Sequence, residues 1–350
     1  MGGDGHASII IDPDILRETY IPDKLKARQA QKEQILSCLS PVAARHKPIH
    51  TWLHGKPGTG KTTTAIHALR TLEEKSRVRT VIVNCWEKPS FYQILNAMVR
   101  EFRVLRAEEN RASFKLEKLR LFLNGHPLVV LLDEIDRIRP RELSTVLYNL
   151  DSVLNAGLIC ISDSTRALTG LAERVRSRIN PHTIFFPSYS RTELMEILTD
   201  RAGTAFADHC WSQAALRQIA GVTQGDARAA IRMLHRAAVT AEQQHLERIT
   251  TDSLRAQLEA AREARKTSVL NSLTRDHRML YEIVRHSRRI LSRDLWQKYL
   301  QHCERIRRKP LACRTFSDYC NTLADGGLIT SERARVRGKV RLFKVLARVS

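Results

Sequence analysis

Three patterns in the sequence predict an α/β protein with a parallel-sheet domain, a helical domain and a C-terminal winged helix. First, an apolar strand, a glycine-rich loop and a helix follow one another over residues 49–72. Second, a continuous apolar run at 128–132 ends in two acids, as a buried parallel strand does at the sheet edge where ligands bind. Third, the pattern is wholly helical from 190 to 264, and three more helices and a hairpin follow.

The loop at 54–63 reads His-Gly-Lys-Pro-Gly-Thr-Gly-Lys-Thr-Thr and fits G-x-x-x-x-G-K-[ST], a pattern that cradles phosphates. Glycines let backbone N–H groups turn inward around phosphate oxygens, and the positive end of the next helix points at them. We expect Lys61 to reach the β- and γ-phosphates of a nucleotide and the Thr62 hydroxyl to hold Mg²⁺. The residues expected to contact the nucleotide here are Pro57, Gly58, Thr59, Gly60, Lys61, Thr62 and Thr63.

Four further apolar segments, at 79–85, 127–132, 157–161 and 184–187, extend the predicted sheet. Because the carboxyl ends of parallel strands meet at one edge, the acids that follow two of them should lie beside the loop. Asp133 would bind Mg²⁺ together with Thr62, and Glu134 would orient the attacking water. Asp163 would lie near the γ-phosphate.

Helices are predicted where apolar residues recur at helical spacing. The ranges are 27–39, 62–72, 91–105, 113–123 and 173–178 in the sheet domain, and 191–206, 213–220, 226–245 and 251–263 in the helical domain.

Two groups of arginines on these helices are candidates for phosphate contacts. Arg174, Arg176 and Arg178 are either a solvated face or include a finger that reaches a neighbouring protomer's nucleotide, with Arg176 as our candidate. Arg228 lies in the first turn of its helix, where the helix dipole disfavours a cation, so we expect it to face the phosphates instead.

The last part of the chain predicts a winged helix. Helices are expected at 275–288, 292–305 and 314–324, followed by a strand from 328, an arginine-rich tip at 331–339 and a return strand at 340–345. The third helix would enter the major groove of DNA, and the wing would lie on the phosphates or in the minor groove. The residues expected to contact DNA are Arg314, Thr315 and Ser317 on the helix and Arg333, Arg335, Arg337 and Lys339 on the wing.

Composition supports a polyanionic partner. The 350 residues carry a formal net charge of +21. From Lys266 onward there are 20 Lys and Arg against 7 Asp and Glu, a local excess too large for an ordinary solvated face. The seven cysteines contain no C-x-x-C pair and fit reduced, mostly buried thiols, and no apolar run approaches the length of a membrane span. We expect an intracellular, cytoplasmic protein associated with the nucleoid, or nuclear if the source is eukaryotic.

The order of motifs resembles that of the origin recognition complex / cell division control (Orc/Cdc) replication initiators of archaeal type, which are AAA+ ATPases. The segments that carry the resemblance are 20–28, 84–92, 186–201, 225–228 and 314–329. The resemblance implies an AAA+ domain (1–187), a helical lid (188–264) and a winged-helix domain (265–350). It also implies that Tyr189, Arg201 and Arg228 seat the lid on ATP, and that the insertion carrying Arg100 and Arg103 touches DNA.

The resemblance implies an ATP-dependent initiator that binds double-stranded origin DNA and helps recruit or load the replicative helicase. We expect slow, regulatory ATP hydrolysis with ATP and Mg²⁺ bound, and self-association on DNA. Where the family usually has Asn at the sensor-1 position, this chain has Asp163, a second acid near the γ-phosphate that would repel it. Two alternatives stay open: an ATP-binding DNA regulator of a plasmid or mobile element, and a clamp-loader or transposition-type AAA+ ATPase.

Overall fold

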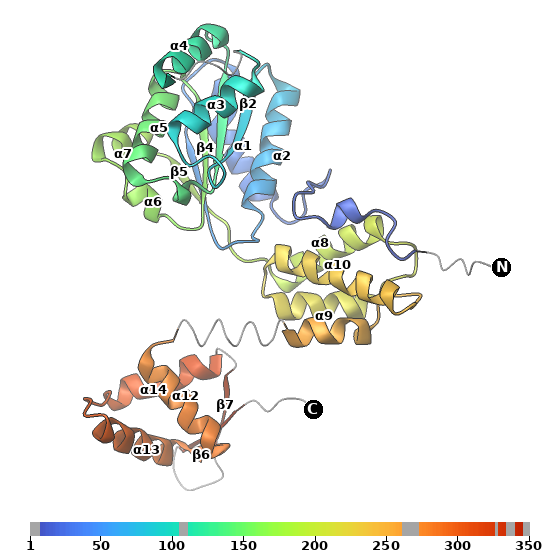
Figure 1. Ribbon diagram of the computed structural model, residues 1–350, viewed down its shortest axis with the longest axis vertical. Coiled ribbons are helices and arrows are strands. Elements are labelled where there is room, and N and C mark those ends of the chain that lie inside the picture. The colour runs from blue at the N-terminus through green and yellow to red at the C-terminus, as the bar shows by residue number, and fades with distance from the viewer. Residues whose placement is uncertain (1–7, 105–110, 261–272, 326–327, 334–339, 346–350) are drawn as a thin grey trace, which may run out of the picture. The chain divides into compact units, whose positions relative to one another are not determined.

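The computed structural model describes residues 8–104, 111–260, 273–325, 328–333 and 340–345 (Figure 1). The chain divides into two compact units between Arg255 and Ala256. The first unit holds the sheet and most of the lid, and the second begins within the last helical segment of the lid (251–260) and holds the winged helix.

The secondary structure of the sheet domain follows the predicted order. Its strands are β1 (Thr51–His54), β2 (Arg79–Asn84), β3 (Leu128–Asp133), β4 (Gly157–Ser162) and β5 (His182–Phe185). Its helices are α1 (Gln29–Ala43), α2 (Lys61–Lys75), α3 (Phe91–Glu101), α4 (Ala112–Leu123), α5 (Pro140–Ser152), α6 (Arg166–Thr169) and α7 (Glu173–Ile179), with 3₁₀ turns η1 (Pro13–Leu16) and η2 (Ile135–Arg137).

The strands form a parallel sheet in the order β2-β3-β4-β1-β5. Because the strands point the same way, the ends of β1, β3 and β4 meet at one edge. The register pairs His54 with Ser162 across β1 and β4, and Leu132 with Cys160 across β3 and β4. The glycine-rich loop after β1 and the acids after β3 and β4 therefore share this edge, as predicted.

Helices cover both faces of the sheet. On one face, α1 and α2 share a core with Val129 and Leu131 of β3. On the other face, α3, α4, α5 and α7 share a core with Leu128, Val130 and Leu132. Each of these β3 residues is buried, which is why the strand is continuously apolar rather than alternating.

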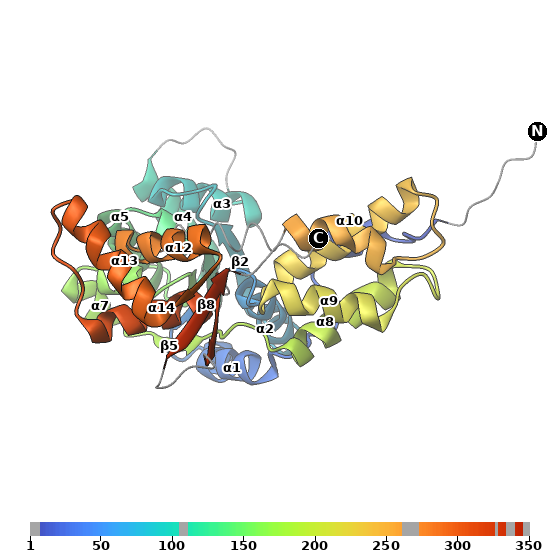
Figure 2. The same cartoon turned by 90° about the horizontal axis from the view of Figure 1, so that it is seen from below.

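The lid consists of α8 (Arg191–Ala205), α9 (Gln213–Thr223), α10 (Ala227–Gln243) and a helical segment at 251–260. The first three helices lie side by side in both views (Figures 1 and 2). A capping box begins α8, because Ser190 accepts the Glu193 N–H and the Glu193 carboxylate accepts the Ser190 N–H. The N-terminal arm contacts the C-terminal end of α8, where the Ile11 N–H donates to the Ala205 carbonyl at 2.8 Å.

The second unit is a winged helix made of α12 (Arg275–Ser287), β6 (Arg289–Leu291), α13 (Ser292–Arg305), α14 (Cys313–Asp325), β7 (Ile329–Arg333) and β8 (Arg341–Val345). Tyr299, Phe316 and Phe343 lie in its core. The Tyr299 hydroxyl donates to Asp276 Oδ1, and Arg308 donates to Asp276 Oδ2. Both carboxylate oxygens of Asp276 therefore have hydrogen-bond donors, and the bond from Tyr299 joins α13 to α12.

Two predicted details of the strands differ from the structure. The wing was expected to have two strands, but β8 also pairs with β6, giving the antiparallel order β6-β8-β7. The last strand of the parallel sheet was expected at 184–187, but β5 begins at His182, which pairs with Thr51. In the part of the chain that the structure describes, no helix combines the length and apolar character needed to cross a bilayer.

Candidate nucleotide-binding site and DNA-contacting residues

Conformation and space both require glycine at Gly58 and Gly60 of the loop. Their φ angles are +73° and +87°, in the left-handed region that favours glycine. A Cβ on Gly58 would lie 1.9 Å from Asp226 Oδ1, and one on Gly60 would lie 2.1 Å from the Tyr189 hydroxyl. These glycines therefore shape the loop and also let two residues of the lid approach it.

The lid is hydrogen-bonded to the loop by its backbone. The N–H of Ala227, the first residue of α10, donates to the Gly58 carbonyl at 3.0 Å. The N–H of Tyr189 donates to the Gly225 carbonyl at 3.1 Å, and Asp226 caps α10 by accepting the Ala229 N–H. The N-terminus of α10 is thereby placed on the loop, where its partial positive charge favours an anion.

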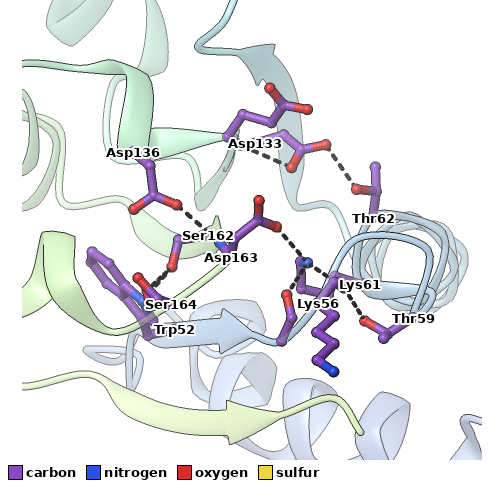
Figure 3. Close-up of polar contacts among 12 residues, drawn as sticks. Trp52, Lys56, Thr59, Lys61, Thr62, Asp133, Asp136, Ser162, Asp163 and Ser164 are labelled. Atoms are coloured by element: carbon purple, nitrogen blue, oxygen red, sulfur yellow. Dashed lines mark hydrogen bonds and ion pairs between the residues drawn. The ribbon is translucent and has the colours of Figure 1, made fainter. Parts of the chain in front are cut away.

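Lys61 is buried within the loop and reaches toward β4 (Figure 3). Its ammonium donates to the carbonyls of Gly55 and Lys56 and lies 3.1 Å from Asp163 Oδ1. Of the other predicted loop contacts, Thr59 is buried, Thr63 is half-buried and Pro57 is exposed.

Thr62 and Asp133 lie together across the site, as predicted from the loop and from β3. The Thr62 hydroxyl donates to Asp133 Oδ2 at 2.8 Å (Figure 3). Burial raises the pKa of the Asp133 carboxyl, while the hydrogen bond from Thr62 and the charges of Lys61 and Arg228 act in the opposite direction. A hydroxyl and a carboxylate are the hard oxygen ligands that Mg²⁺ prefers, so this pair fits Mg²⁺.

Glu134 follows Asp133 in a left-handed conformation, with φ of +54°. Its N–H donates to Asp133 Oδ1 at 2.9 Å, which fixes the turn at the end of β3. Glu134 thus directly follows the Thr62–Asp133 pair at this edge of the sheet, with a half-buried side chain.

The end of β4 is held by its neighbours. The Asp163 N–H donates to Asp136 Oδ2 at 2.9 Å, and the indole N–H of the buried Trp52 donates to the Ser162 hydroxyl at 3.1 Å. The Asp163 side chain remains 64% exposed, with Lys61 as its ion-pair partner. Asp163 therefore pairs with the Lys61 ammonium, the group that a phosphate loop otherwise directs at the γ-phosphate of a nucleotide.

The structure places both of the predicted lid arginines, Arg228 and Arg201, against the N-terminal arm, and Arg232, which was not predicted, shares the partner of Arg228. Arg228 and Arg232 both lie 3.3 Å from the carboxylate of Glu18. The charge of Arg228 also acts to lower the pKa of the Asp133 carboxyl, against the larger effect of burial. The buried Arg201 donates to the carbonyls of Ile15 and Tyr20, so its described contacts order the arm rather than the loop.

The three arginines of α7 have different surroundings. Arg178 donates to Asp151 Oδ2 at 2.6 Å, and the same carboxylate lies 3.1 Å from His50 Nε2. His50, just before β1, and Asp151, in the last turn of α5, are both buried, and His50 lies at the opposite edge of the sheet from the loop. All three arginines are exposed, but Arg178 is paired with the buried Asp151, so Arg174 and Arg176 remain the candidates for a finger.

Arg28 ends the segment 20–28 that carries the family resemblance, but the sequence does not predict its role at the site. It is 2% exposed and donates to the carbonyls of Thr59 and Pro187. Asp226, which lies against Gly58, was likewise seen only as part of the 225–228 motif. Neither residue belongs to a hydrophobic period or to the loop pattern, so sequence spacing gives no signal of these contacts.

The predicted DNA-contacting residues that the structure describes are on the surface or half-buried. Arg100 and Arg103 are exposed at the end of α3. Arg314 is exposed in the first turn of α14, with Thr315 and Ser317 half-buried beside it, and Arg333 is exposed at the end of β7. Arg335, Arg337 and Lys339 lie outside the described residues.

These features define an AAA+ ATPase: a phosphate loop after β1, acidic residues at the ends of the neighbouring strands β3 and β4, and a lid seated on the loop. In agreement, residues 45–169 match the AAA domain family, residues 195–259 match the Cdc6 AAA+ ATPase-type lid domain and residues 278–349 match the CDC6 C-terminal winged helix domain.

Whole-length relatives give the particular family. The chain is 30% identical to the ORC1-type DNA replication protein of Picrophilus torridus, over 94% of this chain and 86% of the relative. It is 27% identical to ORC1-type DNA replication protein 2 of Thermoplasma acidophilum, over 98% of this chain and 90% of the relative. The chain belongs to the ORC1-type, or Orc/Cdc6, family of AAA+ DNA replication initiators.

Solved structures share the fold over nearly the whole chain. Cdc6p from Pyrobaculum aerophilum superposes with a TM-score of 0.66 at 22% identity, covering 97% of this chain and 94% of that one. The Aeropyrum pernix ORC1 protein, solved in complex with DNA, gives a TM-score of 0.65 at 24% identity, covering 96% of this chain and 94% of that one. The predicted fold class, an AAA+ α/β domain with a helical lid and a winged helix, is thus confirmed.

Proposed function

We propose that this protein binds double-stranded origin DNA and that ATP, held between the phosphate loop and the lid, sets its DNA-binding state. The observation that carries the proposal is the seat of α10 on the loop, where Ala227 donates to Gly58 and Asp226 fills the space a Cβ would need. A γ-phosphate in the loop would lie at the N-terminus of a lid helix, so its presence or absence would act directly on the lid.

Different residues of the site would bind the phosphates, hold Mg²⁺ and orient the water for hydrolysis. Lys61 and the N–H groups of the loop would bind the phosphates, and Thr62 and Asp133 would hold Mg²⁺, which supplies charge neutralisation when bound. Glu134 would orient the attacking water. Arg228 would exchange its partner Glu18 for phosphate oxygens.

We infer that hydrolysis is slow and regulatory. Asp163 holds the Lys61 ammonium at 3.1 Å and brings a second negative charge to the γ-phosphate position. A carboxylate there opposes the charge that develops in the transition state, whereas a neutral amide would not.

The DNA contacts proposed for this chain are the first turn of α14, the wing and the end of α3. The exposed Arg314 and Arg333 fall in the part of the chain where Lys and Arg outnumber acids by 20 to 7. The related Aeropyrum pernix ORC1 protein was solved in complex with DNA. Phosphate contacts from arginine would supply affinity, and the α14 side chains would meet base edges.

We extend the same proposal to three further properties: recruitment of the replicative helicase, self-association on origin DNA and a location with the nucleoid. Self-association would give Arg174 or Arg176 a neighbouring nucleotide to contact. The exposure of both side chains on α7 supports this role.

One alternative is favoured by a specific observation. The Lys61–Asp163 pair also suits an ATP-holding DNA regulator of a plasmid or mobile element that hydrolyses little. A clamp-loader or transposition-type ATPase has less support, since the match over residues 278–349 is to a winged helix domain that such a protein would not need.

DNase footprinting across DNA from the protein's own genome tests the origin-specific function. We expect a discrete protected repeat in the presence of ATP, with affinity that falls log-linearly with salt at about −0.9 per phosphate contacted. Uniform protection of all DNA would contradict origin recognition.

A further inference from the structure

The guanidinium of Arg28 is buried where the phosphate loop, the end of the sheet and the start of the lid meet. Arg28 lies just before α1 and is 2% exposed. Its Nε donates to the Thr59 carbonyl at 3.0 Å, and its Nη2 donates to the Pro187 carbonyl at 2.6 Å. Its guanidinium carbon lies 3.9 Å from the centroid of the Tyr189 ring. One side chain therefore contacts all three parts.

The bond to Thr59 controls how the loop presents its N–H groups. Because a trans peptide is planar, the Thr59 carbonyl and the Gly60 N–H point in opposite directions. Holding the carbonyl on Arg28 aims the Gly60 N–H away from Arg28, as a phosphate cradle requires. Thr59 is also held through its hydroxyl, which donates to the Lys56 carbonyl at 2.8 Å.

The remaining contacts tie the same guanidinium to the lid. Pro187 leads from β5 into the lid, and the Tyr189 hydroxyl lies against Gly60. The carboxylate of Glu193, which belongs to the capping box of α8, lies 3.7 Å from Arg28 Nη1. A movement of the lid must therefore move groups that Arg28 holds.

We propose that Arg28 is a positioning residue for nucleotide binding, which couples the position of the lid to the conformation of the phosphate loop. The inference rests on the proposed function, because it assigns a role within ATP binding. Arginine suits this position because its planar fork reaches two carbonyls while its face lies on an aromatic ring. Lysine keeps the charge but cannot reproduce both contacts, so Arg28→Lys separates charge from geometry.

Two measurements on the full chain test the role of Arg28. ATP affinity is measured with Arg28→Lys and Arg28→Ala, and hydrogen exchange is followed in the loop (56–61) and the first turn of α10 (227–230). We expect Arg28→Lys to weaken ATP binding by about tenfold and Arg28→Ala by more, because buried carbonyls lose their donors. In the wild type, ATP should protect both segments together, whereas in Arg28→Lys the loop should be protected without the lid.

A matched control and a double mutant keep the result interpretable. Arg17→Ala removes an exposed arginine of the same arm that pairs with Asp14, and should change neither measurement. Arg28→Lys combined with Tyr189→Leu should lose less affinity than the two losses multiplied, since the residues act as one unit. Thermal unfolding of each nucleotide-free variant separates loss of fold from loss of coupling.

The outcomes separate a failure of the role proposed for Arg28 from a failure of the proposed function. Wild-type affinity in Arg28→Lys, or joint protection of loop and lid in that variant, would overturn the role of Arg28. Failure of the wild-type protein to bind ATP would overturn the proposed function itself.

Discussion

The carboxylate of Asp163 lies 3.1 Å from the ammonium of Lys61, so the lysine of the phosphate loop has an anionic partner within the protein. A nucleotide must compete with that partner for the same charge. The pair is accessible, since 64% of the Asp163 side chain is exposed, and solvent screening keeps its strength modest.

Replacing Asp163 by Asn should strengthen ATP binding and raise turnover. The amide keeps the size of the side chain but removes the charge that competes for Lys61 and repels the γ-phosphate. We expect ATP to bind on the order of threefold to fivefold more tightly, in line with an exposed ion pair. Titration with a fluorescent ATP analogue measures the affinity, and the remote exposed Asp208→Asn is the control. Equal or weaker ATP binding by Asp163→Asn would show that the acid has another role.

Replacing Glu134 by Gln should preserve ATP binding while lowering turnover by roughly a hundredfold or more, because a water-orienting base contributes about that factor. Asp133→Asn is the matched comparison, since it removes the carboxylate that accepts from Thr62 and should weaken Mg²⁺-dependent binding as well. Single-turnover hydrolysis beside equilibrium binding separates the two effects. Unchanged turnover in Glu134→Gln would mean that another residue orients the water.

The free energy of unfolding should fall as the pH is lowered below about 6.5, in part because of His50. Burial lowers the pKa of His50, while its partner Asp151 acts in the opposite direction. At pH values between the folded and unfolded pKa values of His50, the imidazole is protonated in the unfolded chain but neutral in the folded protein. The free energy of unfolding therefore rises with pH across this range, and the contribution of His50 is lost below the folded pKa.

A His50→Gln variant isolates this contribution. Its urea unfolding at pH 5.5 and 7.5 should show a smaller pH dependence than that of the wild type, by up to about 1.4 kcal/mol per pH unit. The other histidines with lowered pKa values, His54, His67 and His277, are common to both proteins and cancel in the difference. An identical pH dependence would indicate that His50 is not neutral in the folded protein.

Replacing Arg335 and Arg337 by Ala should weaken DNA binding and spare ATP binding. The two residues belong to the wing segment that joins β7 to β8. If each contacts a phosphate, the slope of log affinity against log salt should decrease by about 1.8 in magnitude. Fluorescence anisotropy on a labelled duplex gives the slope, and Arg17→Ala is the control for loss of an exposed arginine outside the wing. Unchanged affinity would make the basic wing an ordinary solvated surface.

The parts of the fold that were predicted correctly rest on local patterns. The loop is a contiguous motif, and β3 is apolar throughout because both of its faces are buried. The helix at 27–39 was expected to end before Pro41, yet α1 runs to Ala43. The Ser40 hydroxyl donates to the Ser37 carbonyl at 3.1 Å, which supplies the donor that Pro41 lacks. The strand β6 has three residues, too few for a period to be read.

The parts of the site that could not be predicted depend on contacts between distant residues. Arg28 meets partners 31 and 159 positions away along the chain. Arg174, Arg176 and Arg178 are equivalent in sequence, and only the buried Asp151 separates Arg178 from the others. The pairing of Arg228 with Glu18 likewise appears only when the arm is folded on the lid.

The central claim is that ATP seated between loop and lid sets the DNA-binding state. The most direct measurement compares the affinity of the full chain for one origin duplex without nucleotide, with ADP and with ATP at a single salt concentration, alongside Lys61→Ala. The account predicts a clear difference between the ATP and ADP states that disappears in Lys61→Ala. Equal affinity in all three states, with ATP shown to be bound, would contradict it.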